Sequence, residues 1–214
     1  MKRTLVLAFL GLLAFAGTSK ADVIITEFLA DPLDVADSVG EYFELYNSGA
    51  TAIDVGDLTI GDDGSDSLDL SSFAGTFLNP GEFLVFGNEP STTADWVDVD
   101  YSSVGSLFLS NGADEIVITE TSSGTELARL VYTDGDAPGD GIALVLNNTA
   151  NAVGGVTQES DYIAEIAAND TLSTADIGSP GVAGSTVISV IPEPASAALI
   201  GCFGAIAFMR RRRS

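Results

Sequence analysis

Histidine is absent from this chain of 214 residues, and cysteine occurs once, as Cys202. The usual zinc and haem sites, and the Ser-His and Cys-His nucleophile pairs, depend on these two side chains. A single cysteine also cannot form a disulfide within the chain. The composition therefore excludes the commonest metal-dependent and nucleophilic enzyme chemistries.

Basic residues are scarce as well, with eight Lys and Arg against 31 Asp and Glu. Seven of the eight lie near the two ends, so Arg129 is the only base between residues 22 and 191. This stretch of 170 residues contains thirty of the acids and has a formal charge of −29. Such a charge repels phosphate backbones, so we expect no nucleic-acid binding. The acids alternate with apolar residues, which predicts one folded domain rather than a disordered acidic tail.

The N-terminus has the three parts of a secretory signal. Lys2 and Arg3 are followed by the apolar run Thr4 to Gly17 and by the small-residue site Ser19-Lys20-Ala21. This order predicts a signal peptide over residues 1–21, cleaved after Ala21. The apolar run is short for a bilayer span, which argues against a first transmembrane helix.

Short apolar segments separated by turn residues follow along the body, the pattern of an all-β sandwich or barrel. Asn79-Pro80-Gly81 predicts a type II turn. No segment of the body keeps a 3.6-residue apolar period, so we expect little helix. The predicted strands are 23–29, 41–47, 52–55, 58–60, 82–87, 115–120, 126–132, 142–146 and 162–164.

Seven motifs of the body occur in a characteristic order. They are Ile25-Thr26-Glu27-Phe28, Gly40 to Asn47, Ile53-Asp54-Val55, Leu58-Thr59-Ile60, Leu78 to Val85, Leu109 to Asp114, and Gly178-Ser179-Pro180-Gly181. In this order they resemble the lamin-tail domain family as it occurs in bacterial exported proteins. Thr59 departs from the family, which often has an aromatic residue there. The resemblance implies an immunoglobulin-like β-sandwich over residues 22–184, a linker over 185–191, and no catalytic residues.

The C-terminus also has three parts. Pro192-Glu193-Pro194 precedes an apolar segment over residues 195–209 and the four arginines Arg210, Arg211, Arg212 and Arg213. This order resembles the PEP-CTERM sorting signal, here residues 192–214, and implies cleavage by an exosortase-type membrane protease. The prolines keep the backbone extended, and a helix over 195–209 would be about 22 Å long, short of the roughly 30 Å core of a bilayer. The arginines would stop transfer and stay cytoplasmic. The alternative is an ordinary C-terminal anchor helix.

Two clusters of acids have the oxygen ligands and nearby glycines that suit calcium, although neither has the spacing of the helix-loop-helix calcium motif. We expect no other cofactor. The clusters are Asp62, Asp63 and Asp66, and Asp134, Asp136 and Asp140.

Three further features have two readings each. Paired carboxylates such as Glu41 and Glu44 could serve a glycosidase, but a solvated acidic face is the commoner case. Trp96 could stack on a sugar, but a single Trp more often packs in a core or loop. We expect Arg129 to pair with a cross-strand acid such as Glu115, Glu120 or Glu126.

We therefore expect a non-enzymatic, exported protein of the cell surface or extracellular matrix. The tail would first anchor it in the inner membrane, with the domain outside the cytoplasm. Expected partners are the exosortase-type protease and extracellular polysaccharide or surface proteins. The alternatives are a calcium-dependent carbohydrate-binding module and a hydrolase acting on extracellular polysaccharide.

Overall fold

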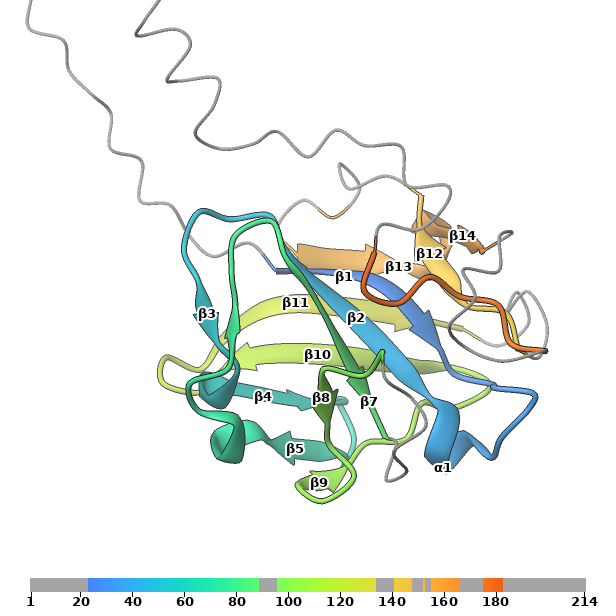
Figure 1. Ribbon diagram of the computed structural model, residues 1–214, viewed down its shortest axis with the longest axis horizontal. Helices are drawn as coiled ribbons and strands as arrows, with labels where there is room; N and C mark the ends of the chain where they lie inside the picture. The colour runs from blue at the N-terminus through green and yellow to red at the C-terminus, as the bar shows by residue number, and fades with distance from the viewer. Residues whose placement is uncertain are drawn as a thin grey trace, which may run out of the picture.

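The fold, taken from a computed structural model, is built from two six-stranded sheets (Figure 1). The structure describes residues 23–88, 96–133, 141–147, 152, 155–165 and 175–182. The first sheet has the order β14 (Tyr162–Ala164), β12 (Leu144–Leu146), β1 (Val23–Leu29), β2 (Tyr42–Asn47), β7 (Phe83–Gly87) and β8 (Val99–Asp100). The second sheet has the order β13 (Val156–Gln158), β11 (Thr125–Tyr132), β10 (Asp114–Glu120), β4 (Leu58–Gly61), β5 (Ser67–Asp69) and β9 (Gly105–Ser106).

The remaining elements are short. β3 (Ile53–Asp54) and β6 (Phe77–Leu78) form a separate two-stranded sheet. Helical structure in the described residues comprises α1 (Asp37–Gly40) and the 3-10 turns η1 (Val55–Asp57), η2 (Leu70–Phe73) and η4 (Glu159–Asp161). The low helix content of the described residues confirms the all-β prediction.

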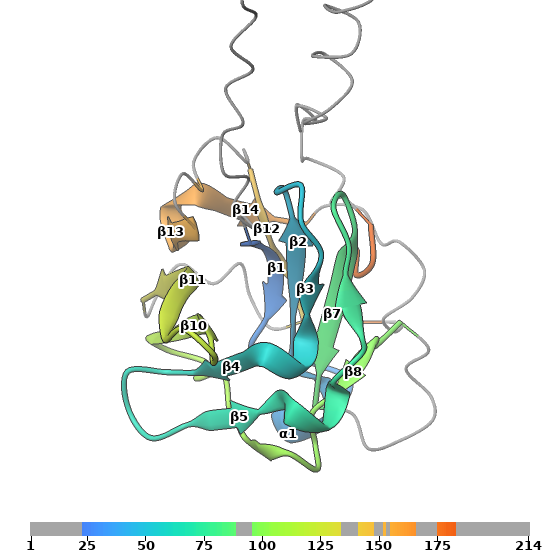
Figure 2. The same cartoon turned by 90° about the vertical axis from the view of Figure 1, so that its left-hand side faces the viewer.

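The two large sheets face each other and enclose the main core. In Figure 2, β10 and β11 lie on one side and β1, β2 and β7 on the other. Phe43 and Phe86 stack at the centre of the first sheet with ring centroids 5.1 Å apart. Phe28 packs against Tyr132 of the second sheet at 5.0 Å, which joins the layers. This is the sandwich architecture that the alternating apolar segments predict.

The hairpin of β10 and β11 has the predicted position and pairs Ile116 with Leu130. The predicted turn before β7 is also present, because Gly81 has φ +81°, the left-handed conformation that the third position of a type II turn requires. The Gly81 N–H donates to the carbonyl of Asn47 at 2.8 Å, which ties this turn to the end of β2.

The outer face of the first sheet is covered, so every residue of β1 and β2 is buried. Residues 175–182, which we call the strap, lie over this face (orange-red in Figure 1). Leu29, Tyr42, Val85 and Ala143 form a second, smaller core with Trp96 packed against it. The first sheet is therefore the middle layer of the domain at this point.

Several predicted segments lie outside the described residues. These are the signal peptide with Ala21, the linker over 185–191, Pro192-Glu193-Pro194, the apolar segment 195–209, the four arginines, and Asp134, Asp136 and Asp140. Within the part of the chain that the structure describes, no helix has the length and apolar character needed to cross a membrane.

Candidate functional site

The strap is fastened to the sandwich through its main chain. Ile177 forms a parallel bridge with Ile142, and its N–H donates to the carbonyl of Gly141 at 2.6 Å. The N–H of Ala143 donates in turn to the carbonyl of Ile177 at 2.8 Å. These bonds place the following residues of the strap over the carboxyl groups of β1 and β2.

Two buried glutamates accept the next donors of the strap. The Ser179 N–H donates to Oε1 of Glu27 at 2.7 Å, and the Gly181 N–H donates to Oε2 of Glu44 at 2.7 Å. Glu27 and Glu44 are direct cross-strand neighbours on β1 and β2, and each is 1% exposed. The pairing register of the two strands therefore sets the position of both acceptors.

A third buried acid reaches the same serine. Glu165, which follows β14, has its Oε2 3.0 Å from the Ser179 hydroxyl. Its own N–H donates to the carbonyl of Ala143 at 2.9 Å, which holds it beside the strap. We call Glu27, Glu44 and Glu165 the carboxyl cluster.

Burial dominates the electrostatics of this cluster. It raises the pKa of Glu27, although the hydrogen bonds from Ser179 and Tyr42 oppose the effect. Burial, followed by the charge of Glu27, raises the pKa of Glu44 well above its ordinary value. The Tyr42 hydroxyl also has a pKa well above its ordinary value because it is buried, so it stays neutral and donates to Glu27. Both glutamates therefore hold a proton more tightly than an exposed glutamate does.

Among the described residues Arg129 is the one basic side chain, and it is engaged elsewhere. Its guanidinium binds Asp63 at 2.8 Å and Glu126 at 2.9 Å on the second sheet. Glu126 was among its predicted partners, but it lies on the same strand rather than across the hairpin. The contact with Asp63 was not predicted.

Glu41 lies apart from the cluster. It accepts the Leu109 N–H at 3.0 Å on the core side, whereas Glu44 faces the strap, so the two acids lie on opposite faces of the first sheet. Burial raises the pKa of Glu41 to about 8. Glu41 and Glu44 therefore do not face each other across a cleft, as a glycosidase pair must.

The acids of the first predicted calcium cluster have separate partners. Asp62 accepts the Asp66 N–H at 2.8 Å, and Asp66 accepts the Phe108 N–H at 2.9 Å. Asp63 is occupied by Arg129. Over the described ranges, no group of three or more acids is arranged to hold a metal ion. Calcium stays a prediction.

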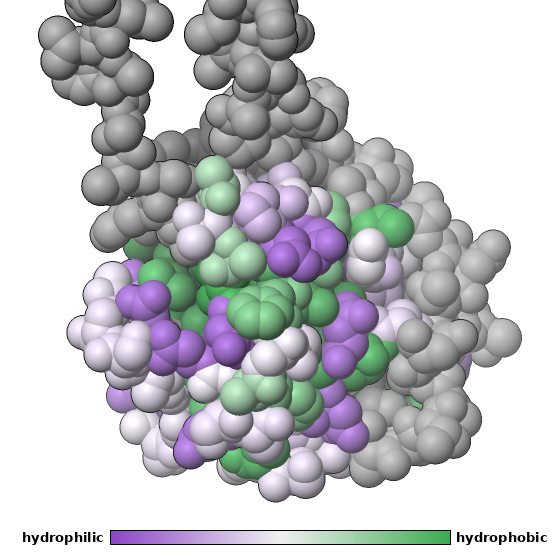
Figure 3. Space-filling model, turned by 60° about the vertical axis from the view of Figure 1, so that its left-hand side comes forward, coloured by the Kyte–Doolittle hydropathy of each residue, from purple (hydrophilic) through white to green (hydrophobic). Residues whose placement is uncertain are grey.

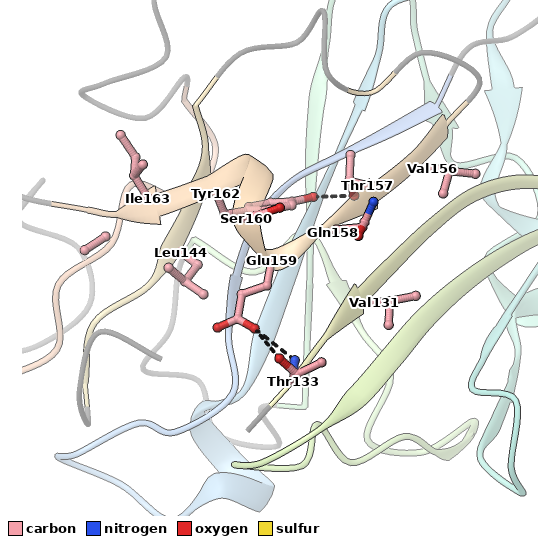
Figure 4. Close-up of a pocket in the computed structure, with 11 residues that line it drawn as sticks. Val131, Thr133, Leu144, Val156, Thr157, Gln158, Glu159, Ser160, Tyr162 and Ile163 are labelled. Carbon is pink, nitrogen blue, oxygen red and sulfur yellow. Dashed lines mark hydrogen bonds between the residues drawn. The ribbon is translucent and has the colours of Figure 1, made fainter. Parts of the chain in front are cut away.

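A groove with a volume of about 740 Å³ lies at the flank of the sandwich, among β11, β13, β12 and β14 (Figure 4). Its described lining includes the partly exposed Val131 and Val156 and one acid, Glu159. Figure 4 shows Glu159 directed at Thr133, whose N–H and hydroxyl donate to it at 2.9 and 3.1 Å. The described lining thus offers mixed apolar and polar contacts rather than a pair of carboxyl groups.

Trp96 packs against Tyr42 with ring centroids 5.0 Å apart, which confirms the predicted packing, and it remains partly exposed. The carboxyl cluster itself was not predicted. The one signal for it was Glu27, an acid within the otherwise apolar or β-branched run of β1. Its partner Ser179 lies 152 residues away, a separation that no local pattern bridges.

Two facing sheets with a covered outer face define an immunoglobulin-like β-sandwich, a module for interaction or structure. The chain belongs to the lamin tail domain family, which matches residues 16–134. The match ends just after β11, and β12, β13, β14 and the strap complete the fold beyond it. No curated protein matches the chain significantly.

Proposed function

We propose that the chain is a non-enzymatic exported protein whose sandwich acts at the cell surface or in the extracellular matrix. The observation that carries this proposal is the order of the tail: Pro192-Glu193-Pro194, an apolar segment, and four arginines. In this proposal an exosortase-type protease cleaves near the proline motif. The tail holds the protein in the inner membrane until then.

The described contacts of the domain join residues between Val23 and Val182. In this proposal both predicted cleavage sites lie outside that range, so removal of the two ends would leave these contacts intact.

The surface supports an interaction role. Figure 3 shows hydrophilic side chains interrupting small apolar areas on one face of the molecule. The formal charge of −29 over residues 22–191 favours neutral or cationic partners over acidic ones. Neutral polysaccharide and basic segments of surface proteins are the partners that we propose.

The test of sorting compares two triple variants in the native host. Pro192→Ala/Glu193→Ala/Pro194→Ala removes the proposed recognition motif, and Val187→Ala/Ile188→Ala/Ser189→Ala is the matched control in the linker. We expect the wild type and the control in the surface or medium fraction and the motif variant in the membrane fraction. The same distribution for all three proteins would refute sorting by this motif.

The rival enzymatic function needs a separate assay. We expect no hydrolysis when the purified protein is screened against extracellular polysaccharides and phosphate esters. Turnover that disappears when one carboxyl pair is replaced by amides would overturn the non-enzymatic proposal.

A further inference from the structure

The Ser179 hydroxyl lies between two carboxyl oxygens. It is 2.5 Å from Oε2 of Glu27 and 3.0 Å from Oε2 of Glu165. A serine hydroxyl has one hydrogen to donate, and an ionised carboxylate has none. If both acids were ionised, the hydroxyl could donate its hydrogen to only one of them. At the other contact a lone pair of the Ser179 oxygen would face a lone pair of the carboxylate. A proton on Glu27 or Glu165 relieves this conflict, because the protonated acid then donates to the Ser179 oxygen.

The Thr26 hydroxyl also contacts the cluster. It donates to Oε1 of Glu44 at 2.6 Å and lies 3.4 Å from the Glu44 carbonyl oxygen. Oε2 of Glu44 accepts the Gly181 N–H. These two donors lower the pKa of Glu44, but burial outweighs them and raises it.

The groups that surround the cluster offer no described positive charge. β1 contributes Glu27, β2 contributes Glu44 and the neutral Tyr42, and the segment after β14 contributes Glu165. Asp98, which precedes β8, adds a negative charge near Glu44. Ionised carboxyl groups directly opposite each other on two strands repel, and burial strengthens the repulsion.

We propose that the strap is a proton-dependent clasp, in which protonated carboxyl groups of the cluster hold residues 175–182 against the first sheet. When these protons are lost at alkaline pH, the strap loosens while the two sheets stay packed. The clasp is a property of the folded domain and does not depend on the proposed export.

The direction of the pH effect depends on whether the folded protein or the unfolded chain binds the proton more tightly. The pKa of Glu27 and Glu44 is raised in the folded protein above the ordinary value of 4.5. The folded protein therefore keeps protons that the unfolded chain has released. Closure of the strap is favoured in acid and weakens as the pH rises through the folded pKa.

Hydrogen–deuterium exchange with mass spectrometry tests the clasp on the full-length protein in detergent. Exchange is followed at about pH 5, 7 and 9, with times scaled for intrinsic exchange. Above the folded pKa of the cluster, we expect the protection factors of strap peptides to fall by about tenfold per pH unit. Peptides of β10 and β11 should keep their protection over the same range. Strap protection that is equal at all three values would overturn the proposal.

Two variants test whether the strap is held by a proton shared between Ser179 and Glu165 or only by the packing of these side chains. Glu165→Gln gives Ser179 a permanent amide donor, so its strap should lose less protection than that of the wild type between about pH 5 and 9. Ser179→Ala removes the hydroxyl, so its strap should show lower protection and a flatter pH dependence. Glu82→Gln, at an exposed carboxyl group, should behave as the wild type. Faster strap exchange of Glu165→Gln at every pH, with β10 and β11 still protected, would show that an ionised carboxylate closes the strap.

Discussion

At Glu41, burial and hydrogen bonding act on the carboxyl group in opposite directions. The Leu109 N–H favours the charged form, but burial outweighs it, and the charges of Asp37 and Asp114 add to the effect of burial. The result is a pKa raised from the ordinary value of 4.5 to about 8. Because the folded protein binds this proton more tightly, its stabilising contribution is present below about pH 4.5 and is lost by about pH 8.

Replacing this acid by its amide should therefore flatten the pH profile of stability. Glu41→Gln cannot ionise, so we expect its unfolding free energy to fall less steeply than that of the wild type between about pH 5 and 8. The difference in slope should be at most about 1.4 kcal/mol per pH unit. Urea unfolding at a series of pH values measures both slopes.

The exposed acid Glu82 provides the matched comparison for this variant. Its carboxylate accepts from the Asn79 side chain at 2.8 Å at the surface, so Glu82→Gln should keep the wild-type slope. Equal slopes for Glu41→Gln and the wild type would contradict the account of Glu41.

The residues of the carboxyl cluster show what a sequence can and cannot predict at this scale. Trp96 was expected to pack and does so, because a lone large apolar ring gains most from burial. Glu27 and Ser179 escaped prediction because their role depends on a contact between distant segments. The ion pair of Asp63 with Arg129 also escaped prediction, because it depends on the fold bringing the loop after β4 to β11.

Among the elements, β1, β2, β10 and β11 follow directly from alternating apolar residues and flanking turns. β13 was missed because Val156-Thr157-Gln158 is short and has no apolar pattern of its own. Its place comes from parallel pairing with Arg129 to Val131 of β11, a tertiary contact. Local pattern therefore predicts the central strands, whereas the edge strand depends on the assembled sheet.

Alanine substitutions at two glycines with the same backbone conformation test the close contact between β13 and β11. Gly155, just before β13, has φ +79°, and a Cβ there would lie 2.1 Å from the Leu127 carbonyl oxygen. Gly81 has φ +81° with no atom within 4 Å of its Cβ position. Both Ala variants incur left-handed strain of about 1–2 kcal/mol, but only Gly155→Ala must also push β13 from β11. Chemical denaturation should show the larger loss for Gly155→Ala; equal losses would contradict the described contact.

For the molecule as a whole, the excess of acids predicts a response to salt. With a formal charge of −29 over residues 22–191, self-repulsion destabilises the compact state. Raising sodium chloride from about 0.01 M to 0.1 M shortens the screening length from about 30 Å to 10 Å, so we expect Tm to rise by a few degrees. A Tm that stays constant or falls would contradict this view.

Calcium chloride at matched ionic strength serves as the comparison for that experiment. Screening alone gives the same rise in Tm for both salts, whereas binding at the acids around Asp62 or Asp134 gives an additional rise that a chelator removes. The pair of salts therefore tests the calcium prediction separately from the general charge effect.

The most direct test of the whole account is the intact mass of the mature protein recovered from the native cell surface or medium. We predict a chain that begins at Asp22 and ends near Pro192-Glu193-Pro194, with the strap retained and Arg210 to Arg213 absent. A mature mass that includes the four arginines would contradict it.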